Sequence, residues 1–183
     1  LKVIAGLLSP SAGSVRIDGV DMTSASVDFR KRIGFLPESP PLYTEMTVTD
    51  FLQHLGQLRG MSRSEVDERL PDVIARCQLV GQEDRVIAEL SHGFRKRVGI
   101  AQAIIHRPKL VILDEPISGL DPVQIIEMRK VIQNLATECT VLVSSHILGE
   151  ISQTCHRILV LVDGRLVADG SEAELAKRFN TGH

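Results

Sequence analysis

Two adjacent carboxylates, Asp114 and Glu115, follow a continuous apolar run at residues 110–113. Such a run is typical of a strand buried on both faces, and open α/β sheets bind ligands where strands of this kind end. Successive side chains of a strand point to opposite sides, so the two carboxylates cannot do the same work. One can hold Mg²⁺, directly or through water, while the other can orient and partly deprotonate an attacking water molecule. This segment alone leaves open the alternative of a strand end capped by solvated acids.

A second motif, at residues 90–97, places Ser91 and Gly93 ahead of a segment with helical spacing. Serine is a favoured helix N-cap, and a glycine would let a phosphate approach the bare backbone. The free N–H groups and the positive dipole at a helix start bind anions. The sequence therefore predicts an anion-binding helix start, with a plain helix cap as the alternative. We interpret the basic residues 95–97 as a solvated helix face or as members of structural ion pairs, because nucleic-acid binding there would need aromatic platforms.

Asp121 and His146 are the remaining polar candidates. Asp121 precedes Pro122, and proline is favoured at the first position of a helix, so this aspartate is either a functional carboxylate or a simple N-cap. His146 follows an apolar run at residues 141–143. A lone histidine at a strand end is more often structural, and its functional assignment depends on the family resemblance given below.

Composition narrows the class of protein. The chain has 183 residues, of which 43% are hydrophobic and 24% charged, with a formal net charge of −2. This is ordinary globular composition, and the balanced charge gives no electrostatic basis for binding nucleic acid or anionic lipid. No apolar run approaches the ~18 residues that span a bilayer, so a link to a membrane would come through a partner. The three cysteines, Cys77, Cys139 and Cys155, form no CxxC pair and are expected to be reduced thiols of a cytosolic protein.

Strand-like and helix-like segments alternate along the chain, which predicts an α/β fold with a parallel, helix-covered sheet. The helical stretch at 47–89 interrupts this alternation and is expected to form a separate lobe. Asp163 and Gly164 join two strands within 157–168, as in a β-hairpin with a type I′ turn. The other strands are expected at 14–18, 32–37, 110–113 and 140–144, and helices at 1–8, 47–60, 64–77, 91–106, 123–137 and 172–179.

Taken in order, these motifs resemble the nucleotide-binding domain of ABC transporters, and the resemblance covers essentially the whole chain, 1–183. Residues 90–94 resemble the family signature, residues 110–115 its Walker B strand and residues 118–121 its D-loop, while His146 resembles its switch histidine. The resemblance implies an α/β P-loop NTPase (ABC ATPase) core with a mostly parallel sheet and an α-helical subdomain. It also implies ATP and Mg²⁺ as cofactors.

The family gives each candidate a role. Asp114 would bind the metal, and Glu115 would be the catalytic residue that handles the attacking water. His146 would contact the γ-phosphate and help to hold that water. Ser91 and Gly93 would face the ATP bound by a second ATP-binding subunit.

Three positions depart from the family pattern. Glu38 falls where the family has its Q-loop glutamine, and a carboxylate there can still supply oxygen to Mg²⁺ and so contribute to cofactor and metal binding. It also adds negative charge near Asp114 and Glu115. His92 and Phe94 stand where the signature usually has glycine and glutamine, and phenylalanine cannot hydrogen-bond a ribose.

The resemblance also implies partners. Asp121 would bridge two ATP-binding subunits, so that the site is complete only in a head-to-tail homo- or heterodimer. Residues 40–43 would lie beside the groove that receives transmembrane permease subunits, with Tyr43 as an exposed contact. No nucleic-acid partner is implied, and the expected location is cytoplasmic and peripheral, on the inner face of the cell membrane. The form of residues 91–97 is similar to the subgroup paired with ABC-2-type membrane subunits, which are often exporters.

One family motif, the P-loop pattern GxxxxGK[ST], does not occur in these 183 residues. In the family it immediately precedes a helix that resembles residues 1–8. The sequence is therefore interpreted as N-terminally truncated, with the N-terminal strands and the Walker A loop absent. Because that loop cradles the β- and γ-phosphates, we predict that the fragment alone binds ATP poorly and hydrolyses none measurably.

The resemblance thus predicts the ATP-binding subunit of an ABC transporter, which couples ATP binding and hydrolysis to transport by separate membrane subunits. One alternative is a soluble ABC ATPase of DNA repair or translation. Another is a truncated, non-catalytic chain that only folds or pairs with a partner.

Overall fold

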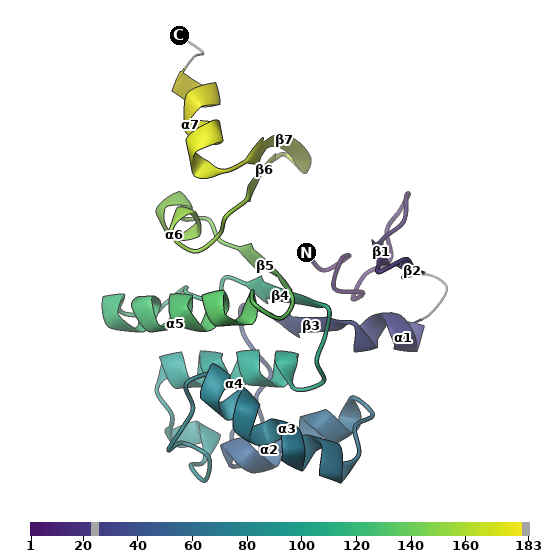
Figure 1. Cartoon of the computed structure of the whole chain (residues 1–183), viewed down its shortest axis with the longest axis vertical. Helices are drawn as coiled ribbons and strands as arrows, with labels where there is room; N and C mark the ends of the chain where they lie inside the picture. The colour runs from purple at the N-terminus through teal and green to yellow at the C-terminus, as the bar shows by residue number, and fades with distance from the viewer. Residues whose placement is uncertain (23–25, 181–183) are drawn as a thin grey trace. The chain divides into compact units, whose positions relative to one another are not determined.

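The structure, a computed structural model, describes residues 1–22 and 26–180. It divides into two compact units, Leu1–Ser144 and Ser145–His183 (Figure 1). Among the described residues, no helix has the length and apolar content required to span a bilayer. The elements of the first unit are β1 (Arg16–Ile17), β2 (Val20–Asp21), α1 (Ser26–Lys31), β3 (Ile33–Leu36), α2 (Val48–Leu58), α3 (Arg63–Arg76), η1 (Ile87–Glu89), α4 (His92–Ile104), β4 (Leu110–Asp114), α5 (Pro122–Leu135) and β5 (Thr140–Ser144).

A parallel sheet of β3, β4 and β5, with β4 in the centre, forms the middle of the first unit. The register pairs Leu36 with Leu113 on one side of β4 and Asp114 with Ser144 on the other. The apolar run of β4 is buried, as its sequence predicts. Val111 and Leu113 enter a cluster with residues of α4 and α5, and Ile112 packs with α1 and the N-terminal segment that includes β1 and β2. The expected α/β fold with a parallel sheet is thus present, and the carboxyl ends of all three strands lie at one edge.

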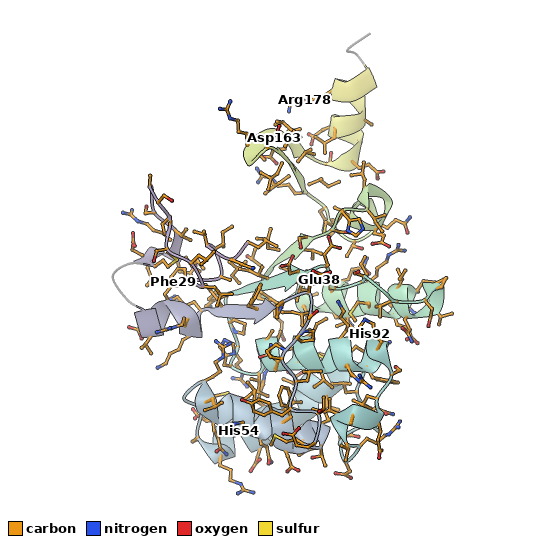
Figure 2. All side chains as sticks on the ribbon, turned by 180° about the vertical axis from the view of Figure 1, so that it is seen from behind. Phe29, Glu38, His54, His92, Asp163 and Arg178 are labelled. Carbon is orange, nitrogen blue, oxygen red and sulfur yellow. The ribbon has the colours of Figure 1, made fainter. Side chains whose placement is uncertain are left out.

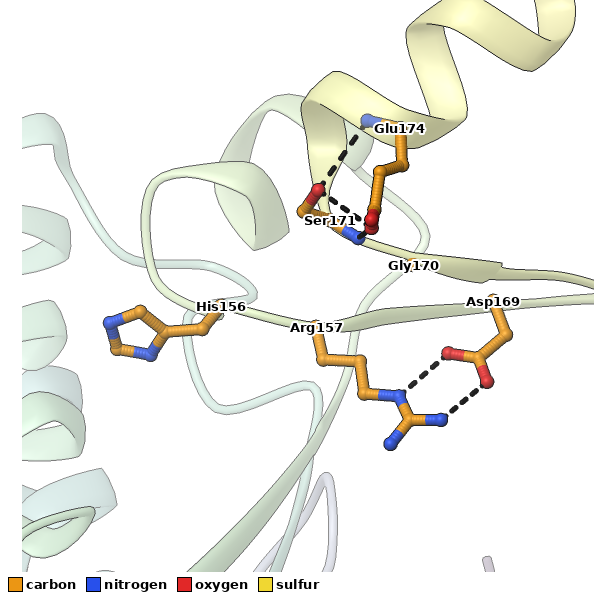
Figure 3. A pocket seen from close by; sticks show the side chains of 6 residues that line it. All are labelled: His156, Arg157, Asp169, Gly170, Ser171 and Glu174. Carbon is orange, nitrogen blue, oxygen red and sulfur yellow. Dashed lines mark hydrogen bonds and ion pairs between the residues drawn. The ribbon is translucent and has the colours of Figure 1, made fainter.

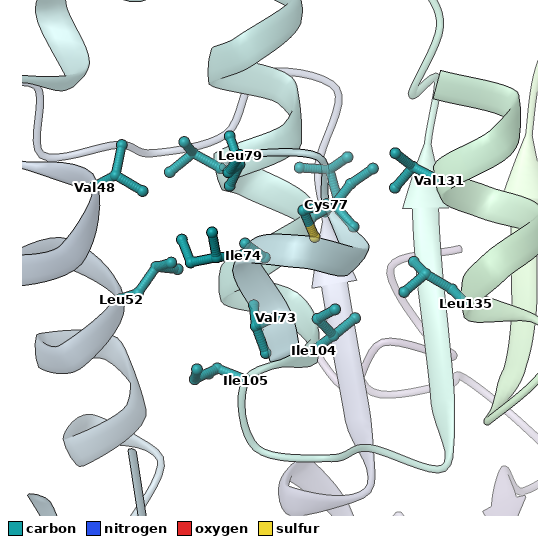
Figure 4. Close-up of a cluster of buried hydrophobic side chains, with 14 of the residues drawn as sticks. Val48, Leu52, Val73, Ile74, Cys77, Leu79, Ile104, Ile105, Val131 and Leu135 are labelled. Atoms are coloured by element: carbon teal, nitrogen blue, oxygen red, sulfur yellow. The ribbon is translucent and has the colours of Figure 1, made fainter. Parts of the chain in front are cut away.

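Helices α2 and α3, which lie within 47–89, begin at well-formed caps. Thr47 accepts the backbone N–H of Asp50 at 3.1 Å, and Ser62 forms a reciprocal capping box with Glu65. Their apolar faces enter one hydrophobic cluster together with residues of α4, α5, β3 and β4. Figure 4 shows the part of this cluster around Cys77, a free thiol whose pKa is raised to about 12 by burial.

The first residues differ from expectation. The helix predicted at 1–8 is a turn, in which the backbone N–H of Ala5 donates to the carbonyl of Leu1 at 2.9 Å. Gly6 has a φ of 72°, and this left-handed conformation ends the turn before a helix can continue. Leu7 is 58% exposed and Leu8 55% exposed. The prediction was wrong because eight apolar-rich residues are too few to specify a helix against a glycine in a left-handed conformation.

The shortest elements were either missed or overestimated. Helices α1 and α6 (Leu148–Ser152) have six and five residues, too few to show a helical period in the sequence. The strand expected at 14–18 is reduced to β1, which pairs with β2 across a turn at Asp18 and Gly19. Both turn residues have positive φ, 49° and 77°, which is the geometry of a type I′ turn.

The second unit contains α6, the antiparallel hairpin β6 (Ile158–Val162) and β7 (Arg165–Gly170), and α7 (Glu172–Asn180). The Asp163-Gly164 signal predicted the hairpin turn correctly, since both residues have positive φ. Arg157 pairs with Asp169 through two hydrogen bonds of 2.7 and 2.5 Å. Ser171 and Glu174 form the cap of α7 beside this ion pair (Figure 3).

His106 joins the end of α4 to the sheet. Its Nε2 lies 3.0 Å from the carbonyl oxygen of Ile33, so Nε2 carries the proton and donates. Its Nδ1 is buried without a hydrogen-bond partner. Burial lowers the pKa of this imidazole to about 4, with Arg59 acting in the same direction. The folded protein therefore holds His106 neutral.

This lowered pKa predicts a pH dependence of stability. The unfolded chain binds a proton at His106 more readily than the folded one, so stability is retained above about pH 6.5 and falls as the pH drops towards 4. The loss amounts to about 1.4 kcal/mol per pH unit within that window.

His106→Gln keeps a donor for Ile33 and removes the titration. Urea unfolding at pH 7.5 and pH 5.0 is expected to show a smaller loss in this variant, by about 1–2 kcal/mol. The exposed His54 gives the control, and His54→Gln should keep the full pH dependence. An unchanged pH dependence in His106→Gln would show that the proton binds elsewhere.

Candidate functional site

Polar residues gather at the carboxyl edge of the parallel sheet. Glu38 follows β3, Asp114 ends β4, Glu115 comes next in the chain, and Ser144 ends β5. Figure 2 labels Glu38 beyond β3 and His92 at the start of α4. Because the three strands are parallel and in register, these residues meet at the edge where open α/β sheets bind ligands. The negative charges of Glu38, Asp114 and Glu115 all act on Lys96 of α4, and their work as one site stays a prediction.

Asp114 is half-buried and held by a neighbouring strand. The hydroxyl of Ser144 donates to Asp114 Oδ1 at 2.6 Å, and the two residues are register partners in β4 and β5. A short hydrogen bond to an ionised acceptor is stronger than one between neutral groups. Ser144 therefore fixes the orientation of the carboxylate, a role that the strand prediction did not assign to it.

Glu115 has a φ of 49°, a left-handed conformation that is uncommon for residues other than glycine. Its backbone N–H points to β5, where it lies 3.2 Å from the carbonyl oxygen of Ser144 and 3.2 Å from its Oγ. Its carbonyl oxygen accepts from Lys96 Nζ at 3.0 Å. Both backbone polar groups are thus bonded, and these bonds offset the cost of the unfavourable conformation.

Lys96 is only 2% exposed. Its ammonium donates to the carbonyl oxygens of Glu38 and Glu115, each at 3.0 Å. Burial lowers the pKa of Lys96, while the negative charges of Glu38, Glu115 and Asp114 act in the opposite direction. A single buried cation therefore connects the segment after β3 with the segment after β4.

The interpretation of residues 95–97 as a solvated face was wrong for Lys96 and Arg97, because Arg97 is also buried, at 5% exposure. The alternative of a structural ion pair is confirmed for Arg97, which pairs with Glu127 of α5. Helical spacing contained the missing signal. Gly93, Lys96 and Ile100 lie three and four residues apart, so they share the face of α4 that enters the core.

Ser91 caps α4 by accepting the backbone N–H of Phe94 at 3.4 Å. Gly93 is buried, and a Cβ there would lie 2.9 Å from the side chain of Gln124 on α5. The packing of α4 against α5 is therefore sufficient to explain this glycine. The anion-binding role of both residues stays a prediction.

Residues 90–97 and 118–121 contact one another through His92. A Cβ on Gly119 would lie 3.4 Å from His92 Nε2, so the imidazole packs on the backbone of the loop between β4 and α5. Asp121 Oδ1 accepts the backbone N–H groups of Val123 and Gln124 at 3.0 and 2.9 Å. The N-cap assignment of Asp121 is thereby confirmed, and its role between subunits stays a prediction.

His146 and Tyr43 are the two remaining predicted residues. His146 belongs to the unit Ser145–His183, and its functional role stays a prediction. Tyr43 is 42% exposed, as expected. Its ring packs edge-on against Phe51, with 5.8 Å between centroids, so the exposed ring has a fixed orientation.

The side chains at the sheet edge suit a hard cation bound together with a second ligand. No group of three or more His, Cys, Asp or Glu close enough to hold a metal ion occurs in the part of the chain that the structure describes. Asp114 and Glu38 offer carboxylate oxygens, and Mg²⁺ at phosphate sites typically uses one or two carboxylates together with phosphate and water oxygens. The donor set fits Mg²⁺ carried by a phosphate ligand better than a cage made by the protein alone.

Comparisons with known proteins agree with these motifs. Residues 1–118 match the family described as "ABC transporter". The chain is 34% identical over 181 residues to the Bacillus subtilis protein YxlF, named an uncharacterized ABC transporter ATP-binding protein. This alignment covers 99% of this chain and 60% of YxlF. It is 38% identical to BcrA of Enterococcus faecalis, named a bacitracin transport ATP-binding protein, over 97% of this chain and 58% of BcrA.

A solved structure is similar across the fold. The protein cbiO1 from Clostridium perfringens, described as part of the ABC transporter complex cbiONQ, superposes with a TM-score of 0.83 at 25% identity. The match covers 99% of this chain and 77% of that one. This chain spans less than two thirds of the lengths of YxlF and BcrA.

The bonds of Ser144 predict a loss of stability on truncation. Ser144→Ala removes the donor to Asp114 and one acceptor for the N–H of Glu115, so we expect unfolding free energy to fall by about 1–2 kcal/mol. Chemical denaturation measures this loss. Ser64, an exposed serine of α3, gives the control, and Ser64→Ala should stay within about 0.5 kcal/mol of wild type. Equal stability of the two variants would contradict the role given to Ser144.

Proposed function

We propose, from the premise that this chain belongs to the ABC transporter family, that it forms part of an ATP-binding subunit. The native protein would couple ATP binding and hydrolysis to the movement of a substrate by separate transmembrane permease subunits. The observation that carries this proposal is the pair Asp114 and Glu115, fixed by Ser144 and Lys96 at the carboxyl edge of a parallel sheet. The names of relatives such as BcrA support the link to transport.

Each side chain at this edge has a distinct task. Asp114, oriented by Ser144, would supply an oxygen ligand to Mg²⁺. Glu115 would accept a hydrogen bond from the attacking water and orient it, and Glu38 would add a second oxygen at the metal or its water shell. Bound Mg²⁺ would neutralise charge that develops on the transferred phosphoryl group.

We further propose that a complete site needs a second subunit. Ser91 and Gly93 would face the nucleotide of that subunit, Asp121 would lie between the subunits, and His146 would contact the γ-phosphate. The description of cbiO1 as part of a transporter complex supports assembly with other subunits. The partner could be identical or different, and no nucleic acid is required.

Three finer assignments accompany this proposal. Residues 47–89 would act as the helical lobe, and Tyr43 would contact the permease subunits. The membrane partners would be of the ABC-2 type, which the form of residues 91–97 favours, and many such systems are exporters. The subunit would then be a cytoplasmic protein held peripherally on the inner face of the membrane by its partner. A soluble ABC ATPase without a transport role is the competing function, and co-purification with a membrane protein distinguishes the two.

The pattern GxxxxGK[ST] does not occur among the 183 residues, and in P-loop proteins that pattern binds the β- and γ-phosphates. We therefore propose that these residues alone bind ATP poorly and do not turn it over.

A nucleotide titration tests this last point. Calorimetry on the 183-residue chain is expected to show no saturable ATP binding, because the phosphates lack their backbone cradle. An ABC ATP-binding protein that contains the GxxxxGK[ST] pattern gives the positive control and should bind ATP tightly. Micromolar binding by this chain would contradict the proposal.

Replacement of Glu115 tests the function itself. Glu115→Gln in the full-length protein keeps the size of the side chain but weakens its ability to accept a proton, so we expect ATP turnover to fall by about 100-fold or more. ATP binding should persist, which a filter-retention measurement with labelled nucleotide detects. Glu68→Gln alters an exposed glutamate of α3 and should leave phosphate release unchanged. Unimpaired hydrolysis by Glu115→Gln would refute the role of this carboxylate.

A further inference from the structure

We propose that Lys96 is a positioning residue for Glu115. Its ammonium holds Glu115 in the left-handed conformation and at the same time donates to the main-chain carbonyl of Glu38. This inference rests on the proposed function, because it concerns the carboxylate assigned there to the attacking water. Lys96 acts only through main-chain atoms and contacts neither nucleotide nor metal in this proposal.

The first argument is the geometry of the ammonium. Lys96 Nζ lies 3.0 Å from the carbonyl oxygen of Glu115 and 3.0 Å from that of Glu38. An ammonium has three donors and no acceptor, so two of its N–H groups are used by these carbonyls. Hydrogen bonds from a charged donor are roughly twice as strong as neutral ones. The two segments are therefore tied by one side chain of α4.

The second argument is the conformation that these bonds maintain. Glu115 has a φ of 49°, and a residue in this region persists only where surrounding bonds impose it. Its N–H is bonded to Ser144 on one side, and Lys96 bonds its carbonyl on the other. Without Lys96 the carbonyl of Glu115 keeps the longer 3.3 Å bond from the backbone N–H of Ser118 but loses its charged donor. We therefore expect the backbone at Glu115 to be held less firmly and its carboxylate to shift relative to Asp114.

The third argument is the cost of placing a charge here. Lys96 is 2% exposed, and lysine is almost never fully buried unless its charge is compensated. A core position on α4 would be filled at lower desolvation cost by an apolar side chain such as its neighbour Ile100, which is fully buried. The charge is compensated here by the carbonyls and by the nearby carboxylates. Packing alone therefore does not explain Lys96, whereas the alignment of the two segments that its ammonium joins does.

Two substitutions separate hydrogen bonding from packing. Lys96→Met fills a similar volume and removes every donor. Lys96→Gln keeps two N–H donors and removes the charge. Lys130, an exposed lysine of α5, gives the matched control as Lys130→Met. All variants are made in the full-length protein.

Steady-state ATP hydrolysis is the first measurement. We expect Lys96→Met to lower kcat by about tenfold or more while KM for ATP changes by less than about threefold, because misplacement of Glu115 impairs turnover rather than nucleotide binding. Lys96→Gln should recover kcat to within about threefold of wild type. Lys130→Met should match wild type. A wild-type kcat in Lys96→Met, an equal loss in kcat and in ATP affinity, or no recovery in Lys96→Gln would each overturn the proposal.

Hydrogen–deuterium exchange without nucleotide is the second measurement, and it does not depend on catalysis. Lys96→Met should increase exchange in peptides that contain Glu38 and in peptides that contain Glu115, and Lys96→Gln should not. Unchanged exchange in Lys96→Met would overturn the proposal.

The two measurements keep the claims apart. Absence of ATP turnover in the wild-type protein would refute the proposed function, while the exchange result would still decide whether Lys96 ties the two segments. If Lys96→Met does not fold, Lys96→Gln decides the matter. Turnover within about threefold of wild type supports the role of the donors, and a loss of about tenfold overturns it.

Discussion

The parallel register of β4 between β3 and β5 is the constraint on which the candidate site depends. It pairs Asp114 with Ser144, and a shift by one residue would turn every side chain of β4 to the opposite face. The apolar run of β4 is buried on both of its faces, so burial places the strand in the core without choosing between the two alignments. The ladders to β3 and β5 set the register, and the hydroxyl of Ser144 orients the carboxylate of Asp114.

Sequence reasoning was most successful where a pattern has one physical cause. The continuous apolar run predicted the central strand, Asp163 and Gly164 predicted the hairpin turn, and serine or aspartate before a helical period predicted helix starts such as Asp121. It failed at residues 1–8, where a short apolar segment favours a helix but Gly6 adopts a left-handed conformation and ends the turn. Local patterns of this kind carry no information on which distant groups will meet.

The hydrogen bonds of the site join groups that lie far apart in the sequence, so local patterns do not predict them. Lys96 lies 58 residues from Glu38 and 19 from Glu115, and no local spacing indicates that one ammonium would join both. Its helical phase with Ile100 shows only that it faces the core. The left-handed conformation of Glu115 is likewise invisible in the sequence, because glutamate gives no turn signal. The residue types at the site could be predicted, but the bonds that hold them could not.

A buried cation at this position has a physical consequence for the rest of the first unit. Replacing a buried ion pair by apolar residues is often neutral or stabilising, so stability alone is weak grounds for retaining Lys96. An apolar side chain would satisfy the core but would remove the charged donor from two carbonyls, of which that of Glu115 keeps the 3.3 Å bond from the N–H of Ser118. A hydrogen bond to a charged group contributes about 1.5–3 kcal/mol. The ammonium makes both bonds only when the segments after β3 and β4 both lie within reach. A movement of the segment that contains Glu38 would therefore displace Lys96 Nζ and strain its hydrogen bond to the carbonyl of Glu115. Lys96 thus couples the positions of these two parts of the sheet edge.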